Sequence, residues 1–167
     1  MNCHLGVTLN SRRQSVLVVG YGSLLRSDDG VGQQVATEVM SWQAPHVQAI
    51  AVHQLTPELA DRLAKTDVVI FVDAYPALAE SEVQVHPLTL SNSVMTMGHW
   101  CEPSVLLTMT QVLYSHYPQA WWIGVPGVNF ELGKTFSAIA KQGVENALQQ
   151  IAHLIQAARI ESCTKLG

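Results

Sequence analysis

Residues 16–30 read VLVVGYGSLLRSDDG, an apolar run followed by two glycines, an apolar pair, two adjacent aspartates and a third glycine. A short continuous apolar run that ends at glycines is typical of a buried strand in a parallel sheet. Directly after this stretch, Val31, Val35 and Val39 recur every four positions, which predicts a helix with one apolar face. The stretch therefore predicts a strand–loop–helix unit whose loop carries two carboxylates.

The rest of the chain continues this alternation of apolar runs and helical periods. Further strands are predicted at residues 47–52, 68–72 and 121–125, with a looser edge strand at 82–88. Helices are predicted to begin at Thr56-Pro57 and at Pro103, and Thr135 is the predicted cap of the last helix. Such alternation predicts an α/β fold, a three-layer arrangement in which helices cover both faces of a twisted, mainly parallel sheet.

The length fits one domain. The chain has 167 residues, and 48% of them are hydrophobic. This is enough for a full core and too apolar for a disordered protein. We expect residues 1–14 to be a flexible leader and residues 15–160 to form a single domain.

Charge and hydropathy exclude two classes of partner. The net charge is -4 and Lys and Arg form no cluster, so the sequence lacks the basic footprint of a nucleic-acid-binding protein. No apolar run approaches the roughly 20 residues of a membrane span, and no basic amphipathic helix is evident. We therefore expect neither nucleic acid nor a membrane as a partner. We also expect the protein to be a monomer.

The cysteines indicate the compartment. Cys3, Cys101 and Cys163 are an odd, scattered set without C-x-x-C spacing, which argues against a disulfide framework and a structural zinc site. Arg12 and Arg13 before an apolar run are similar to a twin-arginine export signal, but the run breaks at Gly20 and no small-residue cleavage site follows. We expect a cytoplasmic protein.

The glycine loop has two interpretations without a metal. A dinucleotide fingerprint needs a third glycine where Leu25 stands, and two carboxylates at the loop would repel a pyrophosphate. In a purely structural interpretation, the glycines make tight turns and one aspartate caps the following helix. That interpretation suits Asp28 or Asp29 taken singly, but only one of them can be the cap.

Two more side chains belong to the same layer of loops. Asp73 follows the strongest strand, and the carboxyl ends of the first and third strands can be neighbours in a parallel sheet. His99 follows a glycine just before the helix at Pro103, whereas the other six histidines need no special account. Together, Asp29, Asp73 and His99 would suit a divalent ion such as Ni, Zn, Co or Fe. The two carboxylates alone could instead perform acid–base chemistry.

These three motifs, GYGSLLRSDDGVG, VVIFVDA and GH before a helix, resemble the hydrogenase maturation endopeptidases over about residues 16–157. The stretch HQLTPELA at residues 53–60 is further similar to the branch that acts on bidirectional, cyanobacterial-type [NiFe] hydrogenases. Such a resemblance implies an α/β endopeptidase that removes the C-terminal extension of the hydrogenase large-subunit precursor after nickel insertion.

The resemblance also implies roles for particular residues. Asp29, Asp73 and His99 match the metal-contacting positions of the family, and the nickel is expected to be carried by the precursor. Asp29 and Asp73 are also the candidates for catalysis, because the base could be either of them if nickel does not itself activate water. Four further positions are candidates for the substrate loops: Gly20, Gly22, Gln54 and Thr56.

Two alternatives to a protease remain open at this point. A nickel-sensing or nickel-delivery module without proteolysis would use the same ligands, although the chain has no His-rich or Cys-rich tract. A nucleotide-binding domain would use the glycine loop instead.

Overall fold

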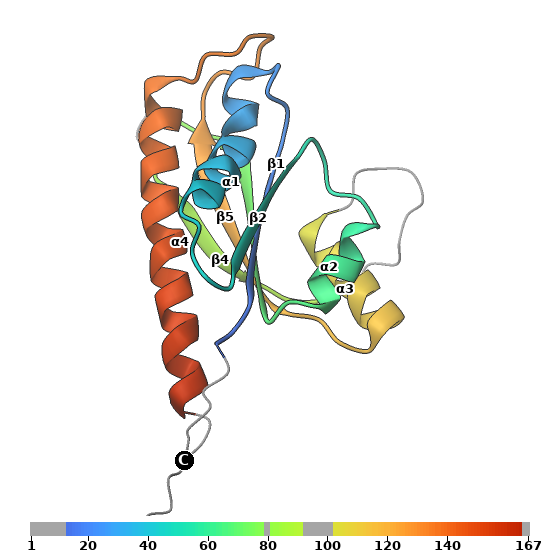
Figure 1. Cartoon of the computed structure of the whole chain (residues 1–167). Coiled ribbons are helices and arrows are strands. Elements are labelled where there is room, and N and C mark those ends of the chain that lie inside the picture. The colour runs from blue at the N-terminus through green and yellow to red at the C-terminus, as the bar shows by residue number, and fades with distance from the viewer. Residues whose placement is uncertain (1–12, 79–80, 92–101, 165–167) are drawn as a thin grey trace, which may run out of the picture.

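The computed structural model describes residues 13–78, 81–91 and 102–164. Their strands are β1 (Val16–Tyr21), β2 (Val47–Val52), β3 (Val68–Pro76), β4 (Gln84–Leu88) and β5 (Gln119–Gly127). Their helices are the 3₁₀ turn η1 (Ser27–Gly30), α1 (Val31–Ser41), α2 (Leu59–Ala64), α3 (Pro103–Tyr114) and α4 (Ala138–Thr164). Figure 1 shows these elements and the long α4 along one side of the molecule.

The strands form one sheet in the order β2-β1-β3-β5-β4. β1 pairs in parallel with β2 and β3, and β3 pairs in parallel with β5. The edge strand β4 is antiparallel to β5. This sheet confirms the predicted mainly parallel architecture, and it places the ends of β1 and β3 side by side.

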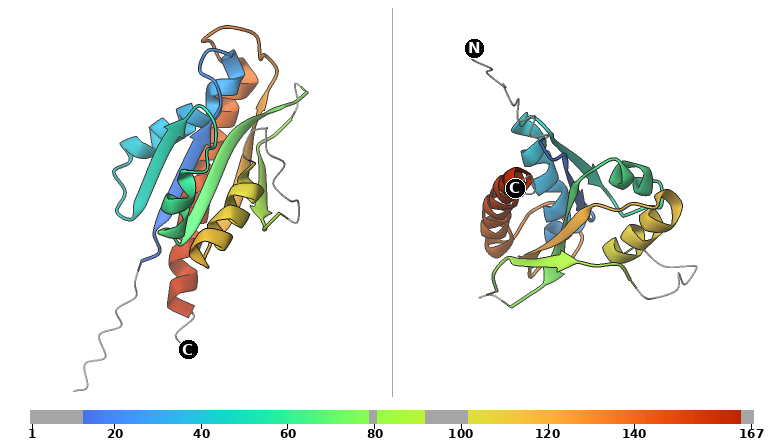
Figure 2. Two further views of the ribbon diagram at one scale, coloured as in Figure 1. Left: turned by 90° about the vertical axis from the view of Figure 1, so that its right-hand side faces the viewer. Right: turned by 90° about the horizontal axis from the view of Figure 1, so that it is seen from below.

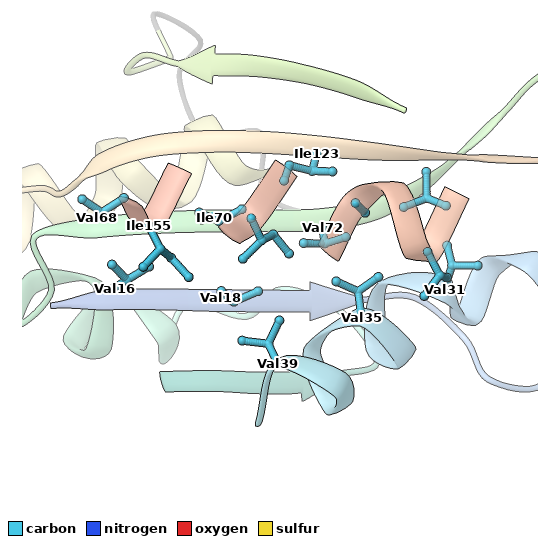
Figure 3. Packing of buried hydrophobic residues seen from close by; sticks show 14 of the residues in the cluster. Val16, Val18, Val31, Val35, Val39, Val68, Ile70, Val72, Ile123 and Ile155 are labelled. Carbon is cyan, nitrogen blue, oxygen red and sulfur yellow. The ribbon is translucent and has the colours of Figure 1, made fainter. Parts of the chain in front are cut away.

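The helices cover both faces of the sheet, as predicted (Figure 2). Alternate residues of each strand face opposite layers. Val16 and Val18 of β1 belong to the core under α1 and α4, which Figure 3 shows from close by, whereas Leu17 and Val19 belong to the core under α2 and α3. Strands buried on both faces explain why β1 and β3 read as unbroken apolar runs.

Several predicted boundaries were wrong, among them those of β3, α2 and α4. β3 continues to Pro76 instead of ending before Asp73, because it keeps its pairing with β5 as far as Gly127. The helix expected from Thr56-Pro57 begins at Leu59, after a turn in which the Leu59 N–H donates to the Thr56 carbonyl at 3.1 Å. α4 begins at Ala138, and the Ser137 hydroxyl, in place of Thr135, accepts the Ala140 N–H at 3.3 Å.

Tertiary packing also changed the predicted face of α3. The apolar residues of its sequence, Val105, Leu106, Met109, Val112 and Leu113, predict the buried stripe of this helix. Val112 and Leu113 are nevertheless exposed, and α3 buries Leu106, Leu107 and Thr110. In the described part of the chain, no helix is both long and apolar enough to cross a membrane. The predicted leader at residues 1–14 lies mostly outside the described residues.

Candidate functional site

The site lies at the carboxyl ends of the parallel strands, where open α/β sheets bind ligands. A cavity of about 600 Å³ opens there, and Asp29 and Asp73 both line it. Asp29 comes from η1 after β1, and Asp73 lies in β3 beside the end of β1. The two carboxylates selected from the sequence therefore share one cleft.

Hydrogen bonds fix the loop that carries Asp29. The Ser23 N–H donates to Asp29 Oδ2 at 2.8 Å. Gly22 has a φ of +126°, and a Cβ there would lie 1.9 Å from the Asp29 carbonyl oxygen, so only glycine fits this turn. The Gly22 N–H donates to the His53 carbonyl at 3.2 Å, and Gln33 Nε2 donates to the Gly22 carbonyl at 2.6 Å. Since the Gly22 and Ser23 N–H groups are already used, they are not free to cradle a phosphate.

The adjacent aspartate, Asp28, has a different environment. Its side chain is fully buried, and its carboxylate accepts hydrogen bonds from the backbone N–H groups of Val128, Asn129 and Ser137 and from the Ser137 hydroxyl, at 2.7 to 3.0 Å. Burial raises the pKa of Asp28, but these donors outweigh it and leave the pKa below its ordinary value. Asp28 thus ties the β5–α4 loop to η1, and neither aspartate caps α1 with its side chain.

Asp73 is held in a half-buried position that disfavours its charged form. Burial and the nearby charge of Asp29 raise the pKa of Asp73, while the Ala74 N–H, which donates to Oδ1 at 2.8 Å, and the Tyr21 hydroxyl lower it. The balance raises this pKa from 3.8 to about 6. A carboxylate whose pKa lies near neutrality can exchange protons during a reaction, and a cation in the cleft would stabilise its charged form.

Tyr21 is a site residue that sequence analysis missed. It ends β1, lines the cavity and acts on the Asp73 carboxylate as a hydrogen-bond donor. Burial and then the charge of Asp73 raise the pKa of the Tyr21 hydroxyl far above its ordinary value, so it stays a donor. Its position at the end of the apolar run, between Gly20 and Gly22, was the available signal, because strand ends meet in the site layer.

Only two of the four remaining sequence candidates line the cavity. Gly22 and Gln54 line the cavity with Asp29 and Asp73. Gly20 lies under α1, where a Cβ would come within 1.8 Å of the Gly32 carbonyl oxygen, so this glycine allows close strand–helix packing and not a substrate approach. Thr56 is not among the lining residues, and its hydroxyl donates to Glu58.

Several further lining residues are not among the sequence candidates. His53, Arg26, Glu102 and Leu132 all contribute to the cavity wall. His53 follows β2 directly, so its place at a strand end is a signal that the sequence does contain. Leu132 comes from the β5–α4 loop, which nothing in the local sequence relates to η1.

The donor set suits a divalent cation only in part. Within the described residues, no group of three His, Cys, Asp or Glu side chains is arranged to hold a metal ion. Asp29 and Asp73 supply two oxygen donors, and His99, the third predicted ligand, lies outside the described residues. Two carboxylates with open positions can contact a metal that arrives on another molecule, or can pair as acid and base.

Comparison with solved structures identifies the fold. The chain matches the hydrogenase maturating endopeptidase HybD from Escherichia coli with a TM-score of 0.67 and 16% identity, over 86% of this chain and 93% of that one. It matches the [NiFe] hydrogenase maturation protease HybD from Thermococcus kodakarensis with a TM-score of 0.66 and 18% identity, over 84% and 99%.

A third match has the same character. The [NiFe] hydrogenase maturation protease HycI from Thermococcus kodakarensis KOD1 gives a TM-score of 0.64 and 20% identity, over 86% of this chain and 93% of that one. No protein-family model and no curated protein matches the chain. This chain therefore has the fold of the hydrogenase maturation proteases, at a low level of sequence identity.

Proposed function

We propose that this chain is an endopeptidase that removes the C-terminal extension of a [NiFe]-hydrogenase large-subunit precursor after nickel insertion. The observation that carries the proposal is the pair Asp29 and Asp73, which line one cleft at the strand ends of this fold. The named proteases with the same fold support this reaction class over other uses of two carboxylates. The stretch at residues 53–60 favours a bidirectional, cyanobacterial-type hydrogenase as the source of the precursor.

In this proposal, nickel belongs to the substrate. The precursor carries the ion on cysteine thiolates, and Asp29, Asp73 and His99 contact it when the precursor docks. The high pKa of Asp73 supports this role, since a buried carboxylate beside a second carboxylate gains most from a nearby cation. His99 is proposed on the resemblance, and it precedes the cavity-lining Glu102 by three residues in the sequence.

Two routes to hydrolysis fit these residues. In one, the precursor's nickel polarises the scissile carbonyl or lowers the pKa of a water molecule. In the other, a carboxylate removes a proton from the attacking water, and Asp73 is the better base because its pKa of about 6 lies closer to neutrality than that of an ordinary aspartate. Asp73→Asn keeps a side-chain oxygen that can contact a metal, but it removes the carboxylate that would accept the proton from water. This substitution therefore tests the second route.

A processing assay tests the proposed function. The purified chain is mixed with the cognate precursor, nickel-loaded or nickel-free, and the precursor mass is followed. We expect loss of a C-terminal peptide from the nickel-loaded form alone, and no loss with Asp29→Ala. The matched control is Asp61→Ala, which removes an exposed carboxylate of α2 that pairs with Lys65 at 2.7 Å and does not line the cleft.

The assay also distinguishes the nickel-delivery alternative. A delivery module would leave the precursor mass unchanged and would bind free nickel tightly by itself. Processing by Asp29→Ala at the wild-type rate would refute the assignment of the site, even if the reaction class were correct.

A further inference from the structure

Two exposed leucines line the same cleft as the carboxylates. Leu25 is 60% exposed and Leu132 is 87% exposed, and both belong to the cavity wall. Leu25 precedes η1, whereas Leu132 comes from the loop between β5 and α4, more than a hundred residues later. Large apolar side chains that gather at the mouth of a cleft are typical of a binding surface.

The backbone holds these two leucines together. The Gly133 N–H donates to the Leu25 carbonyl at 2.9 Å, and the Ser27 N–H donates to the Gly133 carbonyl at 2.9 Å. Figure 1 shows the β5–α4 loop (orange, at the top) beside the start of α1. Asp28 adds bonds to Val128, Asn129 and Ser137, so both ends of this loop are tied to η1. The leucine pair, Leu25 and Leu132, is thus presented by ordered backbone.

The cleft has a polar and an apolar part. Asp29, Asp73 and Glu102 give its lining an acidic side, and Arg26, whose Nε donates to the Phe130 carbonyl at 3.2 Å, lies by the leucine pair. An occupant that complements both parts carries a cation at the carboxylates and an aliphatic side chain at the leucines. A peptide segment beside a metal-bearing centre has this chemistry, and the open, exposed position of the leucines suits a chain that passes over them.

We infer that the leucine pair is a specificity subsite for an aliphatic side chain of the precursor, close in sequence to the bond that is cut. This inference rests on the proposed function and adds to it a determinant of substrate choice. Because the two loops are already ordered, contact with the leucines would need little further loss of conformational entropy. The leucines would bind and orient the peptide, while Asp29 and Asp73 would contact the reacting end.

Steady-state processing of the nickel-loaded precursor tests the subsite. For the double variant Leu25→Ser/Leu132→Ser, we expect KM to rise about tenfold or more, because the buried area of an aliphatic contact is lost. We expect kcat to change by less than about threefold, since the carboxylates stay in place. Leu25→Met/Leu132→Met should keep the wild-type KM. The matched control is Leu113→Ser, a leucine that is 63% exposed on α3 and does not line the cavity.

The substrate side completes the test as a double-mutant cycle. Each aliphatic residue close to the scissile bond of the precursor, on either side of it, is changed to serine. We expect one of these changes to raise KM with the wild-type enzyme but not with the double variant, which is the signature of direct contact. If the wild type processes the precursor and the double variant keeps its KM, or no substrate position is coupled, the subsite is refuted while the proposed function stands. Failure of the wild type to process the loaded precursor would refute both.

Discussion

At the scale of the residue, the neighbouring aspartates Asp28 and Asp29 have different roles. Asp28 is buried among four donors, whereas Asp29 accepts one backbone N–H and lines the cleft. Asp28→Asn would leave several of these donors without a charged acceptor, so we expect the free energy of unfolding to fall by about 2–4 kcal/mol. Asp29→Asn should change it by less than about 1 kcal/mol. Urea unfolding of both variants measures this difference, and equal losses would contradict the division of roles.

Asp73 is expected to make the stability of the protein depend on pH. Its pKa is raised from 3.8 to about 6 in the folded protein, so the folded state holds this proton more tightly than the unfolded state does. The resulting stabilisation is fully present below the unfolded pKa and is lost as the pH rises through the folded value. Above that window, a charged Asp73 costs the wild type about 2–3 kcal/mol.

Asp73→Asn removes this cost because asparagine carries no charge. We expect the variant to be more stable than the wild type at pH 8, by about 2–3 kcal/mol, and equally stable near pH 4. Thermal unfolding of the metal-free proteins at the two pH values measures this difference in stability. Asp61→Asn is the control for the simple loss of a charge. A gain in stability that is the same at both pH values would argue against a raised pKa of Asp73.

Tyr21 should tune the same group. Its hydroxyl lowers the pKa of Asp73, so Tyr21→Phe is expected to raise that pKa above about 6. Carbon-13 NMR titration of the Asp73 carboxyl reports the change directly. Tyr75→Phe is the matched control, since the Tyr75 hydroxyl donates to the Glu82 carbonyl at 2.6 Å. An unchanged Asp73 pKa in Tyr21→Phe would refute the hydrogen bond from Tyr21 to Asp73.

At the scale of the element, β1 and α1 meet at two glycines. A Cβ on Gly20 would lie 1.8 Å from the Gly32 carbonyl oxygen, and backbone cannot move aside easily. We expect Gly20→Ala to lower the free energy of unfolding by at least about 2 kcal/mol. In Gly30→Ala, the closest atoms would be 3.1 Å away, so the loss should be smaller. Chemical denaturation ranks the two variants, and the reverse order would contradict this account of the packing.

The strand and helix periods of the sequence predicted most of the fold, whereas contacts between residues that are distant in sequence could not be predicted. The apolar runs of β1 and β3 identified buried parallel strands because both faces of the sheet are covered. The stripe on α3 was wrong at Val112 and Leu113, since periodicity cannot tell which side of a helix a neighbouring helix will cover. The bonds from Asp28 to Ser137 join segments that no local pattern connects.

At the scale of the whole molecule, the topology brings the candidate site together. Parallel pairing of β1 with β3 places Asp29 and Asp73 on one cavity, and this juxtaposition followed from the sequence once a parallel sheet was assumed. The sequence analysis overlooked Tyr21 and His53, although both stand at strand ends, whereas the contribution of Leu132 depends on how the β5–α4 loop turns and was not predictable. The site is therefore a property of the strand ends taken together.

The most direct test is the intact mass of the large-subunit precursor after incubation with this protein in heavy-oxygen water. We predict that the nickel-loaded precursor loses its C-terminal peptide and that its new C-terminus gains the heavy isotope, while the nickel-free precursor keeps its mass. Asp29→Ala should abolish the change. An unchanged mass for a correctly loaded cognate precursor would contradict the proposed peptidase, and processing that ignores nickel would contradict the role of the metal.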